Sequence, residues 1–123
     1  MKRRFRLRST TDFERVRRSG KSFPHPLVVL VAAPNDLDQV RVGVAAGRSV
    51  GGAVARNRAK RVLRACVEHW LADLRPGWDL ILLARKPLVE AGHPETLQAV
   101  ERVLRRANLL LKTDEHERTR LLE

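Results

Sequence analysis

The feature that most constrains the fold is an uninterrupted apolar run, Leu27 to Ala33, bounded by Pro26 and Pro34. The run is far shorter than the roughly 20 apolar residues of a membrane helix, and its β-branched valines favour a strand. A strand without polar alternation must be covered on both faces, because either face would otherwise expose apolar side chains to water. We therefore expect a sheet with packed layers on both sides and no transmembrane segment.

Apolar periodicity predicts the other elements. The spacing is helical in three segments and typical of strands in two more. The predicted order is a helix over 10–19, strands over 27–33 and 40–45, a helix over 53–74, a strand over 78–84 and a helix over 94–111. The first two strands are expected to pair as a hairpin, since Pro34-Asn35-Asp36 between them is turn chemistry. The fold class is α+β, a small sheet packed by helices in the order α-β-β-α-β-α.

Length and cysteine content set the organisation and the compartment. A chain of 123 residues supports one core, so residues 1–111 are expected to form a single domain, followed by a frayed polar tail over 112–123. The single cysteine, Cys66, excludes an internal disulfide and suits a reducing compartment. The basic N-terminus lacks the apolar stretch of a secretion signal. A cytoplasmic location is therefore expected.

Positive charge is concentrated in two segments. The chain has 25 Lys and Arg against 14 Asp and Glu, a net charge of +11 and a pI near 11.4. Residues 1–21 hold nine basic and two acidic side chains, and residues 41–64 hold seven basic and no acidic ones, so each segment carries +7. The remaining residues net −3. This distribution indicates an anion-binding surface and a polyanionic partner.

Residues 56–64 place this charge on one face of a predicted helix. Arg56, Lys60 and Arg64 recur every four residues along one line, and Asn57 and Arg61 lie on the adjacent line. Like charges at this spacing repel by a few tenths of a kcal/mol per pair, and a solvated helix face normally alternates signs. The pattern therefore favours contact with nucleic acid over a merely solvated face.

The same residues resemble a known family. Gly43 to Gly47, the small-residue turn up to Ala53 and the run Arg56-Asn57-Arg58-x-Lys60-Arg61-x-x-Arg64 resemble the signature of the bacterial ribonuclease P protein subunit. The likeness includes Arg6-Leu7-Arg8, Asp12-Phe13 and Ala84-Arg85-Lys86-Pro87, and runs from residue 2 to about residue 110. The resemblance implies a left-handed β-α-β crossover, of the class described as ribosomal protein S5 domain 2-like, with the basic run on its helix.

The resemblance also implies a function and a set of site residues. The chain would be the non-catalytic protein component of ribonuclease P, the endoribonuclease that removes the 5′ leader from precursor tRNA. Its partners would be ribonuclease P RNA and precursor tRNA, with no membrane and no small-molecule substrate, and Mg²⁺ would be held mainly by the RNA. The residues expected to face the RNA subunit are Arg48, Arg56, Asn57, Arg58, Lys60, Arg61 and Arg64. A cleft between the first helix and the sheet would receive the single-stranded leader, lined by Phe13, Arg17 and Val31.

The composition alone leaves open a structural RNA-binding protein, such as a ribosomal component, or a DNA-binding protein, because the same positive field attracts any phosphate backbone. The six cations with one Asn suit contact with a phosphate backbone better than the reading of DNA bases. An intrinsic hydrolase is disfavoured, since the four histidines share no metal-ligand spacing and no acid, base and nucleophile converge in the sequence. The glycine-rich stretch Gly47 to Gly52 lacks the Gly-Lys-Ser/Thr ending of a phosphate-binding loop.

Overall fold

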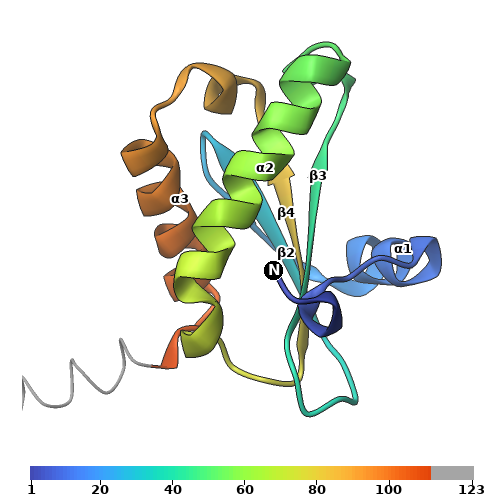
Figure 1. Cartoon of the computed structure of the whole chain (residues 1–123). Helices are drawn as coiled ribbons and strands as arrows, with labels where there is room; N and C mark the ends of the chain where they lie inside the picture. The colour runs from blue at the N-terminus through green and yellow to red at the C-terminus, as the bar shows by residue number, and fades with distance from the viewer. Residues whose placement is uncertain (112–123) are drawn as a thin grey trace, which may run out of the picture.

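A computed structural model describes residues 1–111 as one four-stranded sheet with helices on both faces (Figure 1). The expected frayed tail over 112–123 lies outside the described residues. The helices are α1 (Thr10–Ser19), α2 (Ala53–Trp70) and α3 (His93–Arg106), and the strands are β1 (Lys21–Pro24), β2 (Val28–Pro34), β3 (Arg41–Ala46) and β4 (Trp78–Ala84). Short 3-10 turns are η1 (Arg3–Phe5), η2 (Arg48–Val50), η3 (Leu71–Asp73) and η4 (Lys86–Glu90).

The sheet order is β1-β2-β4-β3, which corrects the predicted hairpin. β2 pairs with β1 and with β4, both antiparallel, while β3 pairs with β4 in parallel. β4 therefore lies between the two strands that were expected to pair with each other. The chain does reverse direction after Pro34-Asn35, but β2 and β3 are separated by the width of one strand, and β4 lies between them.

The parallel pair β3 and β4 is connected through α2 by a left-handed crossover. In Figure 1 both strands run upward, α2 lies in front of the sheet, and β4 lies to the left of β3. About 98% of such connections are right-handed. The α+β class and the crossover implied by the family resemblance are thus confirmed.

The structure adds one strand to the prediction and ends two helices earlier than expected. β1 was missed, because its four residues are mostly exposed and end in a proline. The helix expected over 53–74 ends at Trp70 and continues as the turn η3. The helix expected over 94–111 ends at Arg106, since Asn108 adopts the left-handed conformation, with φ 59°.

The core has two layers, one on each face of the sheet. Alternate residues of β2 point to opposite faces, so that Leu30 packs under α2 and α3 while Val31 packs under α1. This arrangement explains why the apolar run of β2 has no polar alternation. Cys66 lies in the larger layer on the inner face of α2, where burial raises the pKa of its thiol to about 11.

Candidate nucleic-acid interface

The outer face of α2 is a surface of cations that form no ion pair with any residue in 1–111. Ala59, Leu63 and Cys66 are at most 2% exposed and anchor the inner face of α2 to the sheet. Because a helix turns by 100° per residue, the basic residues between them point outward. We call this the α2 cationic surface; it comprises Arg56, Asn57, Arg58, Lys60, Arg61 and Arg64. A shallow hollow of about 530 Å³ lies on it, lined by Val54, Asn57, Lys60, Arg61 and Arg64.

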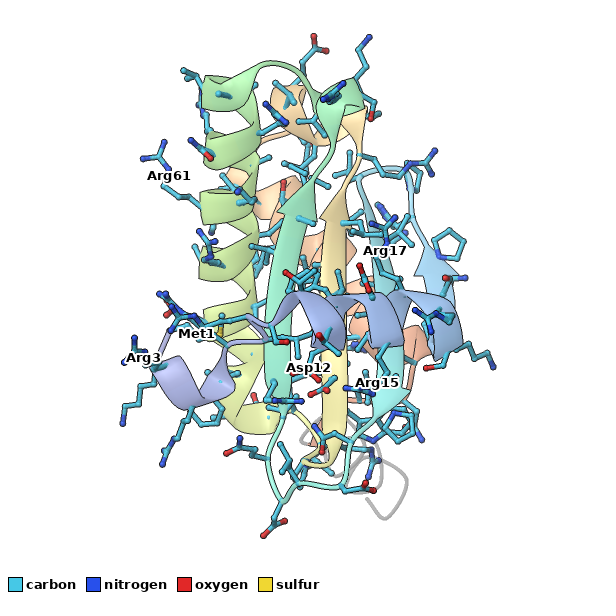
Figure 2. The ribbon with its side chains drawn as sticks, turned by 90° about the vertical axis from the view of Figure 1, so that its right-hand side faces the viewer. Met1, Arg3, Asp12, Arg15, Arg17 and Arg61 are labelled. Carbon is cyan, nitrogen blue, oxygen red and sulfur yellow. The ribbon has the colours of Figure 1, made fainter. Side chains whose placement is uncertain are left out.

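The predicted residues of this surface are not equally exposed. Asn57, Arg58 and Arg61 are exposed, and Lys60 and Arg64 are half-buried. Arg56 is half-buried as well, and its Nε is buried without a hydrogen-bond partner among the described residues. Figure 2 shows Arg61 projecting away from the sheet.

Arg48 lies apart from the others, exposed in the turn η2 where the chain enters the crossover. The structure thus brings together six of the seven residues predicted for this interface on one helix and places the seventh beyond the N-terminus of that helix.

Phe13 lies on α1 against the edge of the sheet. A Cβ atom added at Gly43 would collide with the Phe13 ring, so glycine at this position of β3 permits the close approach of the ring to the strand. Phe13 also lines a hollow of about 280 Å³ between the N-terminal segment, β3 and α2. Three arginines that form no ion pair within residues 1–111 surround this hollow: Arg6, Arg8 and Arg64.

The other two residues predicted for the leader cleft do not line this hollow. Arg17 is exposed and projects from α1 on the side opposite to Arg15 and Asp12 (Figure 2). Val31 is only 5% exposed, because α1 packs over it and Gly20 approaches it so closely that an added Cβ would lie 2.7 Å from its Cγ1. On the same face of the sheet Val29 and Leu83 are half-buried. The alternation of β2 and β4 could have pointed to this pair, which the sequence reasoning missed.

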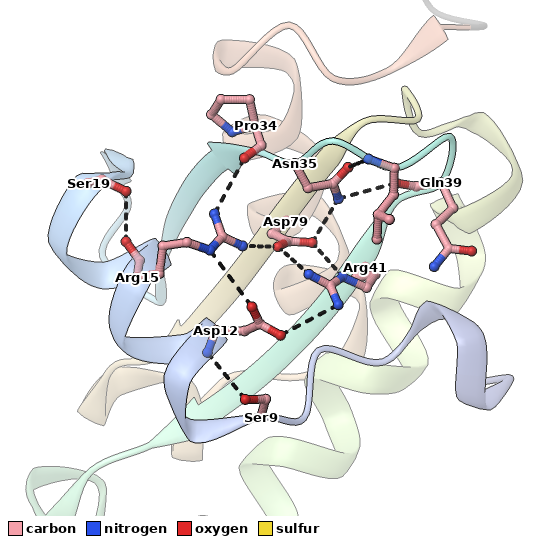
Figure 3. A network of polar contacts seen from close by, with 10 residues as sticks. Ser9, Asp12, Arg15, Ser19, Pro34, Asn35, Gln39, Arg41 and Asp79 are labelled. Atoms are coloured by element: carbon pink, nitrogen blue, oxygen red, sulfur yellow. Dashed lines mark hydrogen bonds and ion pairs between the residues drawn. The ribbon is translucent and has the colours of Figure 1, made fainter.

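A buried ion cluster holds α1 on the sheet (Figure 3). The side chain of Asp79 in β4 has no exposed surface. Arg41 of β3 donates to both of its carboxylate oxygens at 2.8 Å, Asn35 donates to Oδ1 at 2.8 Å, and Arg15 of α1 donates to Oδ2. Asp12 of α1 forms a longer ion pair with Arg41, with 3.5 Å between Oδ2 of Asp12 and Nη1 of Arg41. The cluster therefore joins α1, β3, β4 and the loop after β2.

The ion cluster keeps Asp79 ionised. Burial opposes the charged form, but the hydrogen bonds from Arg41 and Asn35 and the positive charges of Arg41 and Arg15 outweigh it and hold the pKa of Asp79 below its usual value. The hydrogen bond to Asp79 in turn raises the pKa of Arg41. Arg15 and Arg41, one from each basic segment, thus stabilise the fold. The sequence feature that could have indicated this is Asp79, an acidic residue inside a buried strand.

Residues 1–111 contain no group of three or more His, Cys, Asp or Glu side chains arranged to hold a metal ion. Within the same range, no helix has the length and apolarity needed to span a bilayer. The chemistry that the described surfaces offer is the binding of anions by guanidinium and ammonium groups.

Fold and surface together define a class: a small basic α+β domain built on a left-handed β-α-β unit whose helix presents unpaired cations. The ribonuclease P family model matches residues 1–108, and the chain belongs to this family. The chain is 43% identical over 109 residues to the ribonuclease P protein component of Herpetosiphon aurantiacus, covering 89% of each chain. It is 38% identical over 115 residues to that of Roseiflexus sp., covering 93% of this chain and 94% of the relative.

Solved structures support the same assignment. The Staphylococcus aureus RNase P protein superposes with a TM-score of 0.79 at 26% identity, over 86% of this chain and 97% of that one. The Thermotoga maritima RNase P protein superposes with a TM-score of 0.74 at 28% identity, over 82% of this chain and 96% of that one. The chain is therefore similar in sequence and in fold to protein subunits of an endoribonuclease that processes tRNA.

Proposed function

We propose that this protein binds ribonuclease P RNA through the α2 cationic surface and the 5′ leader of precursor tRNA beside α1, and so assists removal of the leader. The observation that carries the proposal is the set of cations that remains unpaired after folding. Of the basic residues in 41–64, only Arg41 forms an ion pair among residues 1–111. Six remain for a partner: Arg48, Arg56, Arg58, Lys60, Arg61 and Arg64.

The leader would bind as a single strand next to Phe13. An aromatic ring gives a base a stacking surface worth about 1 to 3 kcal/mol, and nearby cations neutralise the phosphates. Arg6 and Arg8 lie on the same hollow as Phe13, and Arg17 projects from the same helix. With one aromatic side chain among the three predicted leader residues, this contact relies on charge more than on stacking.

Mg²⁺ would be held mainly by the RNA subunit, as membership of the ribonuclease P family implies. The contribution of the protein is to neutralise phosphates and position the leader. The proposed place of action is the cytoplasm, where precursor tRNA is made.

Magnesium-dependent cleavage tests the proposed function. The protein should lower the Mg²⁺ concentration that ribonuclease P RNA needs to cleave precursor tRNA, because six cations replace counterions at the RNA surface. If all six engage phosphates, log K for the RNA should fall with log salt at a slope of roughly −5, from about −0.9 per contact. An unchanged Mg²⁺ requirement together with a slope near zero would contradict the proposal.

A further inference from the structure

A second cavity lies on the other flank of α2, and the contacts described above do not use it. Its volume is about 210 Å³, and it is enclosed by the first half of α2, the turn η4 and the start of α3. Six of its lining residues are aliphatic: Ala55, Ala59, Val62, Leu88, Val89 and Ala91.

The cavity has a buried apolar floor and a cationic edge. Ala59 and Leu88 are 2% and 3% exposed, whereas Val89 is 43% exposed, a large value for an apolar side chain. Arg58 and His93 are exposed at the edge, and no acidic side chain of residues 1–111 lines the cavity. Arg58 also belongs to the α2 cationic surface, so an RNA backbone on that surface runs past the opening.

We propose that this cavity takes one unpaired base of the RNA that lies on α2, with Arg58 holding the adjoining phosphate. The proposal rests on the proposed function, because it needs an RNA on the α2 cationic surface. A base presents apolar faces that suit an aliphatic floor, and its phosphate complements the cationic edge.

The size and the lining of the cavity limit which part of an RNA could occupy it. Sites for drug-sized ligands measure about 300 to 1,000 Å³, so this smaller cavity suits a single ring system. The lining side chains that can form hydrogen bonds, Arg58 and His93, are at the edge, so the aliphatic floor would discriminate weakly among the four bases. Extruding a paired base costs a few kcal/mol, which favours a nucleotide that is already unpaired in the free RNA.

Filling the cavity tests the proposal. Ala55→Leu places a larger side chain in the cavity and keeps a good helix former, whereas Ala65→Leu makes the same change at an exposed position of α2 that does not line it. Ala91→Leu fills the cavity from the other side and serves if Ala55→Leu folds poorly. Each variant is compared with the wild type for melting temperature and for affinity toward ribonuclease P RNA from the same genome.

The expected result is about a tenfold loss of RNA affinity in each filled variant, with an unchanged salt slope, because a base in an apolar cavity releases no counterions. Ala65→Leu should bind as the wild type does. Mapping of 2′-hydroxyl reactivity should show one unpaired nucleotide whose protection is lost in both filled variants.

Filled variants that bind like Ala65→Leu would overturn the cavity proposal and leave the α2 cationic surface intact. In that case another occupant, such as a peptide, would have to be sought. Absence of RNA binding by the wild-type protein would instead refute the proposed function itself.

Discussion

Arg41 and Arg61 carry the same guanidinium group in opposite surroundings. Arg41 donates two hydrogen bonds to the buried Asp79 and helps to hold α1, β3 and β4 together. Arg61 is exposed on α2, where no described acid pairs with it, and it repels its neighbours. The comparison shows that the basic composition of this chain has two parts. One part is neutralised inside the fold, and the other lies on the surface of α2 with no acidic partner among residues 1–111.

Removing Asp79 should strongly reduce stability. Asp79→Ala leaves Arg41 and Arg15 without their partner, and breaking such a pair at a buried site should cost about 3 kcal/mol in the free energy of unfolding. Thermal unfolding should show a fall in melting temperature of about 10 °C. Asp38→Ala, at an exposed acid, is the control and should leave the melting temperature unchanged. Equal melting temperatures for the two variants would show that the ion cluster contributes little.

Acid should weaken the ion cluster selectively. Since folding lowers the pKa of Asp79, this group stabilises the native state above its unfolded pKa, and the contribution is lost as pH falls through the lower, native pKa. Urea unfolding of the wild type and of Asp79→Asn at several pH values below 5 measures the contribution. The difference in unfolding free energy should shrink as pH falls. A difference that does not change with pH would contradict the assignment of charge to Asp79.

Arg61→Ala should affect binding and spare the fold. Exposed cations contribute little to stability, so the melting temperature should stay within the error of the measurement. Loss of one phosphate contact should weaken binding of ribonuclease P RNA and reduce the steepness of the salt dependence by about one unit. Leu63→Ala, two residues further on and on the buried face of α2, is the opposite control: it should lower the free energy of unfolding by roughly 2 to 5 kcal/mol. If both variants lose stability equally, the two faces of α2 have been misassigned.

Phe13→Leu should have the smallest effect, and one restricted to the leader. Leucine keeps much of the apolar contact with β3 and loses the flat stacking surface, so binding of precursor tRNA by the holoenzyme should weaken by about 1 kcal/mol. Mature tRNA, which lacks a leader, should bind as before. A lower melting temperature with equal losses for both ligands would place Phe13 in the core only.

The sequence predicted the elements better than their arrangement. Apolar periodicity located α1, β2 and β4 to within about one residue. The basic spacing placed Asn57 and Arg61 on a line of α2 that the structure exposes, whereas the adjacent line of Arg56, Lys60 and Arg64 is half-buried. The parallel pairing of β3 with β4 was not predictable from periodicity, because alternation shows which face is buried and not which strand lies alongside.

The ion cluster and the hollow beside Phe13 were missed for a related reason. Asp79 and Arg41 are 38 positions apart, and their contact depends on the register of β3 against β4. Arg64 meets Arg6 and Arg8 across one hollow only because the N-terminal segment bridges to β3, where Leu7 donates to the carbonyl of Val42. Such convergence comes from the tertiary fold, and no local pattern encodes it.

The position of β4 in the sheet also determines the order in which this protein can fold during synthesis. Among the described strands, β4 is the last to leave the ribosome, and it is also the one that pairs with both β2 and β3. A nascent chain that ends before Trp78 holds two apolar strands that lack their common partner, and its α2 has no complete sheet on which to dock. Cooperative folding therefore waits until residues 78–84 emerge. Until then α2, the most basic of the described helices, is exposed without the core that later supports it.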